Sequence, residues 1–146
     1  RWITQLYRRR WVVEQVFRAI KTRGFDIENV SMEAMPFKKL CAMTLIAGVS
    51  CMQLVQDRDG EGKRPLEDVF GAEDQPVLEA VSATLEGKTD KQKNPHAKGS
   101  LAFAAWVCAR LGGWTGYYGK PGPVVMLRGL YQLRSIQLGY GIAGNV

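Results

Sequence analysis

The sequence predicts a mainly α-helical protein. Three segments, residues 1–21, 36–58 and 124–143, carry apolar side chains at helical spacing or in long apolar runs. A shorter segment, residues 101–111, repeats the helical pattern, and stretches rich in glycine and proline separate these segments. At 146 residues, the chain can bury a hydrophobic core, and its length fits one domain or part of a larger protein.

Residues 1–21 are expected to form one amphipathic helix, because a turn of about 100° per residue separates its apolar and polar side chains. The apolar face consists of Leu6, Val13, Val16, Phe17 and Ile20. The polar stripe beside it consists of Tyr7, Arg10, Glu14, Arg18 and Lys21. Ion pairs between residues four apart, such as Arg10 with Glu14, explain such a stripe as ordinary solvated surface. A carboxylate among cations on a rigid helix also suits a site for a metal ion and DNA phosphates.

The spacing of four of these side chains resembles a transposase signature. Tyr7, Arg10, Glu14 and Lys21 stand at the intervals of the Y-x2-R-x3-E-x6-K motif of bacterial cut-and-paste transposases of the insertion-sequence-four family. The resemblance implies that Glu14 is the third acid of a DDE triad, on a helix packed against the sheet of a ribonuclease-H-like fold. It also implies that Tyr7, Arg10 and Lys21 contact transposon-end DNA. Arg18 joins this set on geometry alone.

The resemblance further implies a two-metal site for Mg²⁺ or Mn²⁺, with Glu14 as one ligand and two upstream aspartates as the others. Two metals about 4 Å apart can activate the attacking oxygen and stabilise the leaving oxygen. The chain has no initiator Met and no strand before Glu14, so we expect it to be the C-terminal part of a longer protein and inactive by itself. None of its own aspartates is expected to replace the upstream pair. These are Asp26, Asp57, Asp59, Asp68, Asp74 and Asp90.

A second stretch, residues 98–114 (KGSLAFAAWVCARLGGW), resembles the C-terminal subdomain of Tn-five-type members of the same family. Ser100 is the expected N-cap of this helix, and Gly112-Gly113 should end it. By resemblance, the last helix helps to pair two transposases across two transposon ends. Its alternative role is to close a monomeric bundle. The expected last helix carries Leu127, Leu130, Tyr131, Leu138 and the exposed pair Arg128 and Arg134.

These observations divide the chain into three parts. Residues 1–58 would hold the glutamate helix and a following buried helix of the catalytic core. Residues 59–98 would form an acidic helical spacer and a basic linker, and residues 99–146 a helical subdomain for dimerisation and DNA contact. Residues 1–23 sum to a charge of +6, residues 24–87 to −7 and residues 88–146 to +7. Two basic surfaces around an acidic middle are consistent with a nucleic-acid partner.

The remaining segments carry structural expectations. Gly24 should end the first helix. The helix from Pro36 to about Arg58 should be buried, since its uncharged run is shorter than a membrane span requires. Residues 57–64 should be an exposed loop, residues 73–85 a helix, and residues 87–100 a mobile tether or, alternatively, a phosphate-contacting loop.

The pattern of cysteines and histidine predicts neither a metal site nor a catalytic site. Cys41, Cys51 and Cys108 have no metal-ligand spacing and are expected to be buried, reduced thiols in a cytoplasmic protein. His96, in a polar loop, has no second histidine or nucleophile beside it in the pattern, so we expect no catalytic role for it.

Three classes of function therefore compete. The first is the C-terminal part of a DDE transposase that binds double-stranded DNA as a homodimer, at transposon ends and target, in the bacterial cytoplasm near the nucleoid. The second is a non-catalytic, all-helical DNA-binding or assembly module, or a transposase remnant. The third, a membrane or scaffold protein, rests only on the apolar run after Pro36. We expect no membrane partner.

Overall fold

The computed structural model describes residues 2–21 and 27–143. Within these ranges the regular secondary structure consists of helices and 3₁₀ turns joined by loops, without a β-strand. This confirms the mainly α prediction. The α-helices are α1 (Trp2–Lys21), α2 (Ala34–Asp57), α3 (Gln75–Leu85), α4 (Leu101–Leu111) and α5 (Pro123–Ala143). Short 3₁₀ turns are η1 (Ile27–Asn29), η2 (Leu66–Asp68), η3 (Ala72–Asp74) and η4 (Asp90–Gln92). The predicted stop at Gly24 lies outside the described residues.

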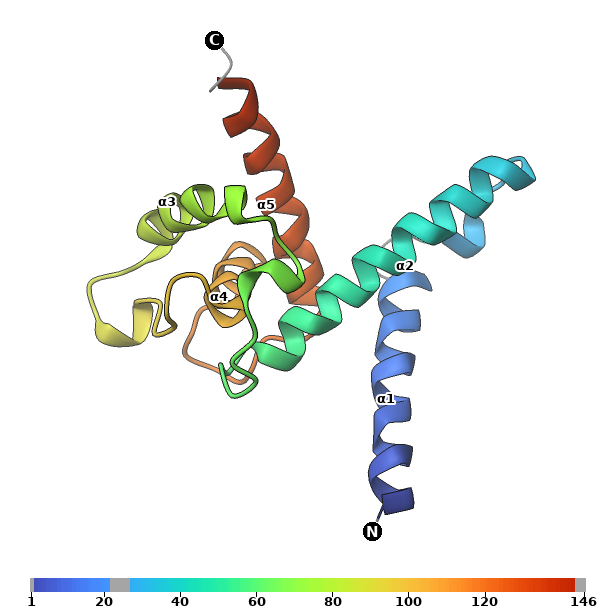
Figure 1. The fold of residues 1–146 in the computed structure, drawn as a ribbon, viewed down its shortest axis with the longest axis horizontal. Coiled ribbons are helices and arrows are strands. Elements are labelled where there is room, and N and C mark those ends of the chain that lie inside the picture. The colour runs from blue at the N-terminus through green and yellow to red at the C-terminus, as the bar shows by residue number, and fades with distance from the viewer. Residues whose placement is uncertain (1, 22–26, 144–146) are drawn as a thin grey trace.

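Helix α4 lies at the centre of the molecule. It packs most extensively against α5, and also against α3 and α2 (Figure 1). Helix α1 stands apart from this cluster and crosses α2, with a smaller contact to α5. The C-terminal two thirds of the chain therefore form a packed unit, to which α1 is joined mainly through α2.

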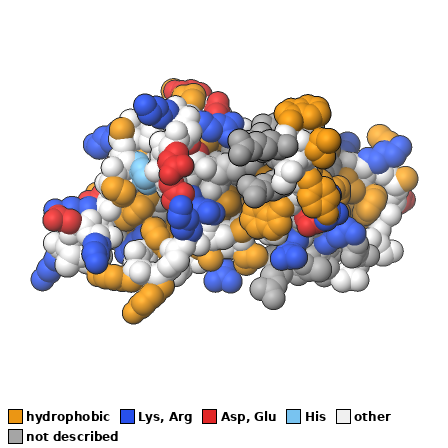
Figure 2. Space-filling model, turned by 90° about the horizontal axis from the view of Figure 1, so that it is seen from below, with side chains coloured by type: hydrophobic (Ala, Val, Ile, Leu, Met, Phe, Trp, Pro, Cys, Tyr) orange, Lys and Arg blue, Asp and Glu red, His pale blue; other side chains and the backbone are white. Residues whose placement is uncertain are grey.

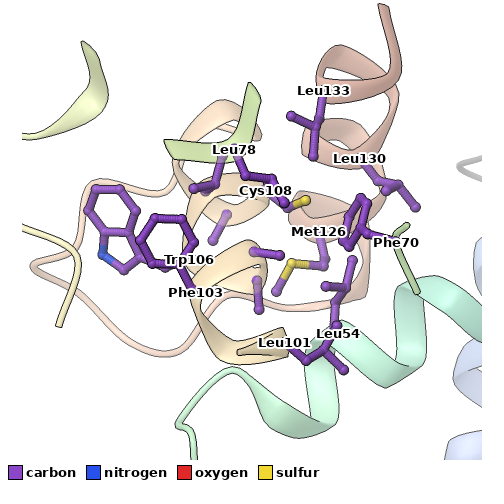
Figure 3. Close-up of a cluster of buried hydrophobic side chains, with 14 of the residues drawn as sticks. Leu54, Phe70, Leu78, Leu101, Phe103, Trp106, Cys108, Met126, Leu130 and Leu133 are labelled. Atoms are coloured by element: carbon purple, nitrogen blue, oxygen red, sulfur yellow. The ribbon is translucent and has the colours of Figure 1, made fainter. Parts of the chain in front are cut away.

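The core gathers around α4, whose side chains are buried on every side from Leu101 to Ala109. A helix that is apolar all round is expected only where other elements surround it. Leu54 from α2, Leu78 from α3 and Met126 from α5 converge on it (Figure 3). The four alanines of α4 let the surrounding helices approach closely. They are Ala102, Ala104, Ala105 and Ala109.

Local signals set the ends of α4 as the sequence predicts. The Ser100 hydroxyl accepts a hydrogen bond from the Phe103 amide at 3.2 Å, which satisfies a free donor of the first turn. At the other end, Gly112 is the C-cap, and Gly113 has a φ of 96°, a backbone conformation that favours glycine. The predicted N-cap and stop are both confirmed.

Helix α2 is buried along only half of its length, so the prediction of a buried central helix was partly wrong. Cys51 and Leu54, near its end, are fully buried in the core, whereas Met43 and Ile46 are 68% and 67% exposed. The physical reason is that α4 and α5 reach only the second half of α2. By length and hydropathy the whole helix is apolar enough to cross a membrane. Its second half, however, is enclosed by protein.

The apolar face of α1 is also largely uncovered, contrary to the expectation of a core-facing stripe. Val13 and Phe17 are 53% and 52% exposed. Val16, which was predicted for this face, does pack against the edge of the core, and so does Val12, which was not. Gln15 between them is buried. Only one helix covers α1 extensively, so only a narrow strip of its surface is buried. The side chains of Leu6 and Ile20, also predicted for this face, lie outside the described set.

Residues 87–100 are held against the core by hydrogen bonds, in contrast to the expected tether. The Asn94 side chain donates to the Phe103 carbonyl at 3.2 Å, and the backbone forms a bridge between Pro65 and Ser100. Lys98 pairs with Glu79 of α3. This segment therefore forms part of the packed unit, and the three-part division of the chain stays a prediction.

Helix α5 places its predicted residues on two kinds of surface. Leu127 and Leu130 are buried against α4, whereas Leu138 is 70% exposed. Arg128 is exposed as predicted. Arg134 is also exposed, but its guanidinium lies over the Phe70 ring at 4.9 Å and pairs with Asp74 at 3.5 Å. Arg134 thus fastens α5 to the turn before α3.

The cysteines are free thiols. Burial raises the pKa of Cys51 to about 12 and also raises the pKa of Cys108, so neither is a thiolate at neutral pH. The Cys51 thiol donates to the Pro123 carbonyl at 3.3 Å. The prediction of buried thiols is confirmed for these two, while Cys41 is only partly buried.

Candidate functional site

Three of the predicted site residues meet on the exposed side of α1. A guanidinium nitrogen of Arg10 lies 3.0 Å from a carboxylate oxygen of Glu14, and the Arg10 guanidinium lies 5.0 Å from the centre of the Tyr7 ring. Helical geometry places these side chains together because residues three and four apart are neighbours. Arg10 is therefore held between a carboxylate and an aromatic ring.

The site is open to solvent. The side chains of Arg10 and Glu14 are 61% and 48% exposed, so their ion pair contributes little to stability, about 0–1 kcal/mol. Such a pair can separate at small cost when a phosphate competes for the guanidinium, because charge-assisted bonds to phosphate are stronger. The arrangement is suited to binding an incoming anion.

Trp11 completes the site and was missing from the predicted site residues. Tyr7, Arg10, Trp11 and Glu14 together line a shallow cavity of about 420 Å³. The signal for Trp11 is its spacing, four residues after Tyr7 on the same helix. Two aromatic faces beside an arginine provide surfaces on which a base or sugar can pack.

Arg18 and Lys21 are exposed on the same helix but do not line this cavity. Lys21 is seven residues after Glu14, which places it about 10 Å further along the axis. Both lie in the last turn of α1, where cations are favoured by the helix dipole. Any DNA contacts they make would be to other phosphates than the one at Arg10.

The face around α1 mixes charged and hydrophobic side chains. Figure 2, viewed from the side where α1 begins, shows hydrophobic side chains exposed among Lys and Arg. The large apolar side chains of α1 that are more than half exposed are Trp2, Ile3, Tyr7, Trp11, Val13 and Phe17. Such a surface is larger than isolated exposed residues would make and is typical of a binding or packing surface.

The side chains around Glu14 that the structure describes do not form a metal centre by themselves. Among the described residues, no three His, Cys, Asp or Glu side chains are arranged to hold a metal ion. Glu14 can provide one oxygen ligand, but a two-metal site requires further carboxylates, and Glu14 is here paired with Arg10. The aspartates that the structure describes lie in other elements, from Asp57 onward.

Comparison with known proteins identifies the part of the chain that carries this site. Residues 1–48 match the family model of the transposase DDE domain. No curated protein and no solved structure matches the chain. The match covers α1 with Tyr7, Arg10 and Glu14, and it extends into the exposed half of α2. The first third of this chain is thus similar to the DDE domain of transposases, which supports a transposase function in general.

Proposed function

We propose that the chain is the C-terminal part of a cut-and-paste DDE transposase of the insertion-sequence-four family, with Glu14 as the third acid of its triad. The observation that carries the proposal is the meeting of Tyr7, Arg10 and Glu14 in one open cavity, within the segment similar to a DDE domain. A carboxylate can bind a metal ion, and a guanidinium and an aromatic ring can hold a DNA strand beside it.

The uncovered surfaces of α1 and α2 support the same proposal. Val13 and Phe17 on α1, and Met43 and Ile46 on α2, are each at least half exposed. In a ribonuclease-H-like domain the glutamate helix packs against a sheet, and these apolar side chains would be buried there. Burial of apolar area would also fix the direction of Glu14 relative to two aspartates on that sheet.

Each residue has a defined role in the proposed site. Divalent metal ions, Mg²⁺ or Mn²⁺, when bound with the upstream aspartates, would supply an activated oxygen and neutralise charge on the scissile phosphate. Glu14 provides a ligand oxygen from a rigid helix. Arg10 and Tyr7 hold the neighbouring phosphate and sugar, and Arg18 and Lys21 hold the strand further along. We further propose that the whole protein acts in the bacterial cytoplasm.

Truncation of Arg10 tests the DNA-binding part of this proposal. In the full-length protein, Arg10→Ala should weaken binding to transposon-end DNA about tenfold, since it removes a charge-assisted bond to phosphate. The slope of log affinity against log salt should fall by about one, because one fewer counterion is released. Fluorescence anisotropy over a salt series measures both quantities.

The matched control for Arg10 is Arg64, which pairs with Asp68 at 2.7 Å in the acidic middle of the chain. Arg64→Ala should leave both affinity and salt slope unchanged. Equal losses in the two variants would mean that Arg10 acts only through the net charge of the protein, and would contradict a local phosphate contact.

We also propose that α5 pairs two copies of the protein. Ile136 and Tyr140 lie one turn apart and line an apolar groove of about 310 Å³ between α3 and α5. Ile136 is 39% exposed and Tyr140 is 57% exposed. A second copy of the same face would cover these side chains, as in a two-fold symmetric contact.

Sedimentation tests the pairing. With end DNA, the full-length protein should sediment as a pair of protomers, and the double variant Ile136→Glu/Tyr140→Glu should sediment as a monomer on DNA. Leu138→Glu is the control. Leu138 is an exposed apolar residue that lies about 200° around α5 from Ile136 and from Tyr140, so this variant should still pair. Monomers alone in the wild-type protein would rule out the pairing.

The competing function is a DNA-binding or assembly module without catalysis. Its supporting observation is that the described residues hold no preassembled metal ligands. The two functions predict different effects of replacing Glu14. In a binding module, Glu14→Gln should increase DNA affinity by removing repulsion from phosphate, and Mg²⁺ should have no specific effect.

A further inference from the structure

Asp57, the last residue of α2, is an unusual buried acid. Its side chain is 1% exposed. Both carboxylate oxygens lack a hydrogen-bond partner in the described part of the chain. Sequence reasoning placed Asp57 in an exposed loop, and the structure shows that expectation to be wrong for this residue. An ionised carboxylate without partners is costly to bury, so its position calls for a compensating positive group.

Glycines let the backbone of the loop pass close to Asp57 and His96. A Cβ atom at Gly62 would lie 2.2 Å from a carboxylate oxygen of Asp57, and one at Gly60 would lie 3.1 Å from Nδ1 of His96. Asp57, Gly60 and His96 line a cavity of about 360 Å³, together with Asp59. Figure 2 shows acidic and basic side chains beside the histidine on this face of the molecule. The loop therefore packs closely against the Asp57 carboxylate, and the cavity lies beside it.

The spacing of acids in this loop is that of a calcium-binding loop. Counting Asp57 as position 1, acids stand at positions 3, 5 and 12, and a glycine stands at position 6. These residues are Asp59, Glu61, Asp68 and Gly62. Positions 1, 3, 5 and 12 provide side-chain oxygens in the twelve-residue EF-hand loop, whose sixth residue is glycine. The loop differs from that pattern by Glu at position 5 and Asp at position 12, and a three-residue 3₁₀ turn, η2, occupies its positions 10 to 12.

We propose that the loop of residues 57–68 binds a calcium ion, with Asp57 as its central ligand and Asp59 as the second. This function is independent of the one proposed for α1. Ca²⁺ accepts carboxylate and backbone oxygens in a flexible shell, which suits a short loop rich in glycine better than the strict octahedron of Mg²⁺. The cavity beside the buried carboxylate, rather than the acidic sequence alone, carries the proposal.

Ion binding requires rearrangement of two exposed ion pairs. Asp59 is 2.7 Å from Lys120, and Asp68 is 2.7 Å from Arg64. Among the described residues the ligands are thus not yet gathered around one point. Both pairs are partly exposed and weak, so their acids can turn to a divalent ion. Of the other cations nearby, Arg58 already donates to the Pro121 carbonyl at 3.0 Å, while Lys63 lines the cavity.

Thermal unfolding of the 146-residue chain tests the proposal, with calcium chloride and magnesium chloride as the probes. Calcium at about a hundredfold excess over its Kd should raise the Tm by about 5 °C or more, and magnesium should raise it less. Titration calorimetry should give one calcium ion per chain. Absence of a calcium-dependent shift, or a larger shift with magnesium, would overturn the proposal.

Three variants locate the ion. Asp57→Asn should raise the Tm in the absence of calcium, because a neutral amide costs less to bury than a carboxylate, and should abolish the calcium shift. Asp59→Asn should weaken calcium binding, and provides the test if Asp57→Asn does not fold. Asp90→Asn, an exposed carboxylate that pairs with Lys93, is the matched control and should retain the full shift.

Glu14→Gln separates this proposal from the one for α1. It should retain the full calcium shift, since Glu14 lies on a different element from the loop. A shift that disappears in Glu14→Gln and persists in Asp57→Asn would assign the ion to α1 and overturn the loop site.

Discussion

Replacement of Glu14 by Gln is expected to abolish strand cleavage by the full-length protein while leaving binding to end DNA intact. The substitution keeps the shape of the side chain but removes the charge that a divalent metal requires. Loss of one charged group from a preorganised site lowers rates by about 10²–10³-fold or more. The measurement is cleavage of a labelled transposon end with Mg²⁺, alongside anisotropy of the same DNA.

Glu67→Gln is the matched control, since Glu67 is an exposed acid in η2, outside the proposed site. It should cleave at the wild-type rate. Undiminished cleavage by Glu14→Gln would contradict the assignment of Glu14 as the third acid. A rise in DNA affinity without any wild-type cleavage would instead support the non-catalytic binding module.

The 146-residue chain alone is expected to show no metal-dependent cleavage, because the described residues form no group of three possible metal ligands. The same cleavage assay tests this expectation on the isolated chain and on its Glu14→Gln variant. Cleavage by the isolated chain that disappeared in Glu14→Gln would show that the ligands are complete without upstream aspartates.

Replacement of Gly129 by Ala is expected to lower the stability of the fold strongly. A Cβ atom at Gly129 would lie 1.6 Å from the Cys108 carbonyl oxygen and 2.9 Å from the Gly112 amide nitrogen. Both neighbours are backbone atoms, so α5 would have to move away from α4. The free energy of unfolding should fall by about 3 kcal/mol or more, which lowers the Tm by about 6–12 °C.

Gly139→Ala is the control on the same helix, because no atom lies within 4 Å of a Cβ built there. It should raise stability slightly, by up to about 1 kcal/mol, since alanine favours a helix more than glycine. Circular dichroism melts of both variants measure the difference. Similar Tm values for the two variants would contradict the close approach of α4 and α5 at Gly129.

Much of the fold follows from local sequence. The sequence predicts a helix over residues 73–85, and the structure has α3 there, with Val77, Leu78 and Val81 buried. Ser100 and Gly113 define the ends of α4 because caps and left-handed glycines act within one turn. The meeting of Tyr7, Arg10 and Glu14 is of the same kind, since helical geometry alone places them together.

Burial was harder to predict. The apolar pattern of α1 favoured Val13, Val16 and Phe17 as core-facing residues, but only Val16 of these packs against the core, together with Val12. Periodicity shows that a helix has an apolar face. Which part of that face is covered depends on the elements that pack on it. The exposed half of α2 follows from the same cause.

The sequence by itself determined where α4 begins and ends, and that Tyr7, Arg10 and Glu14 gather on one side of α1, because these features depend on interactions within a few residues. Only the tertiary structure decided that α4 is enclosed on every side, that residues 87–100 are held through Asn94, and that Asp57 is buried without a hydrogen-bond partner among the described residues. Those features depend on contacts between segments far apart in the chain, whose packing no local pattern specifies.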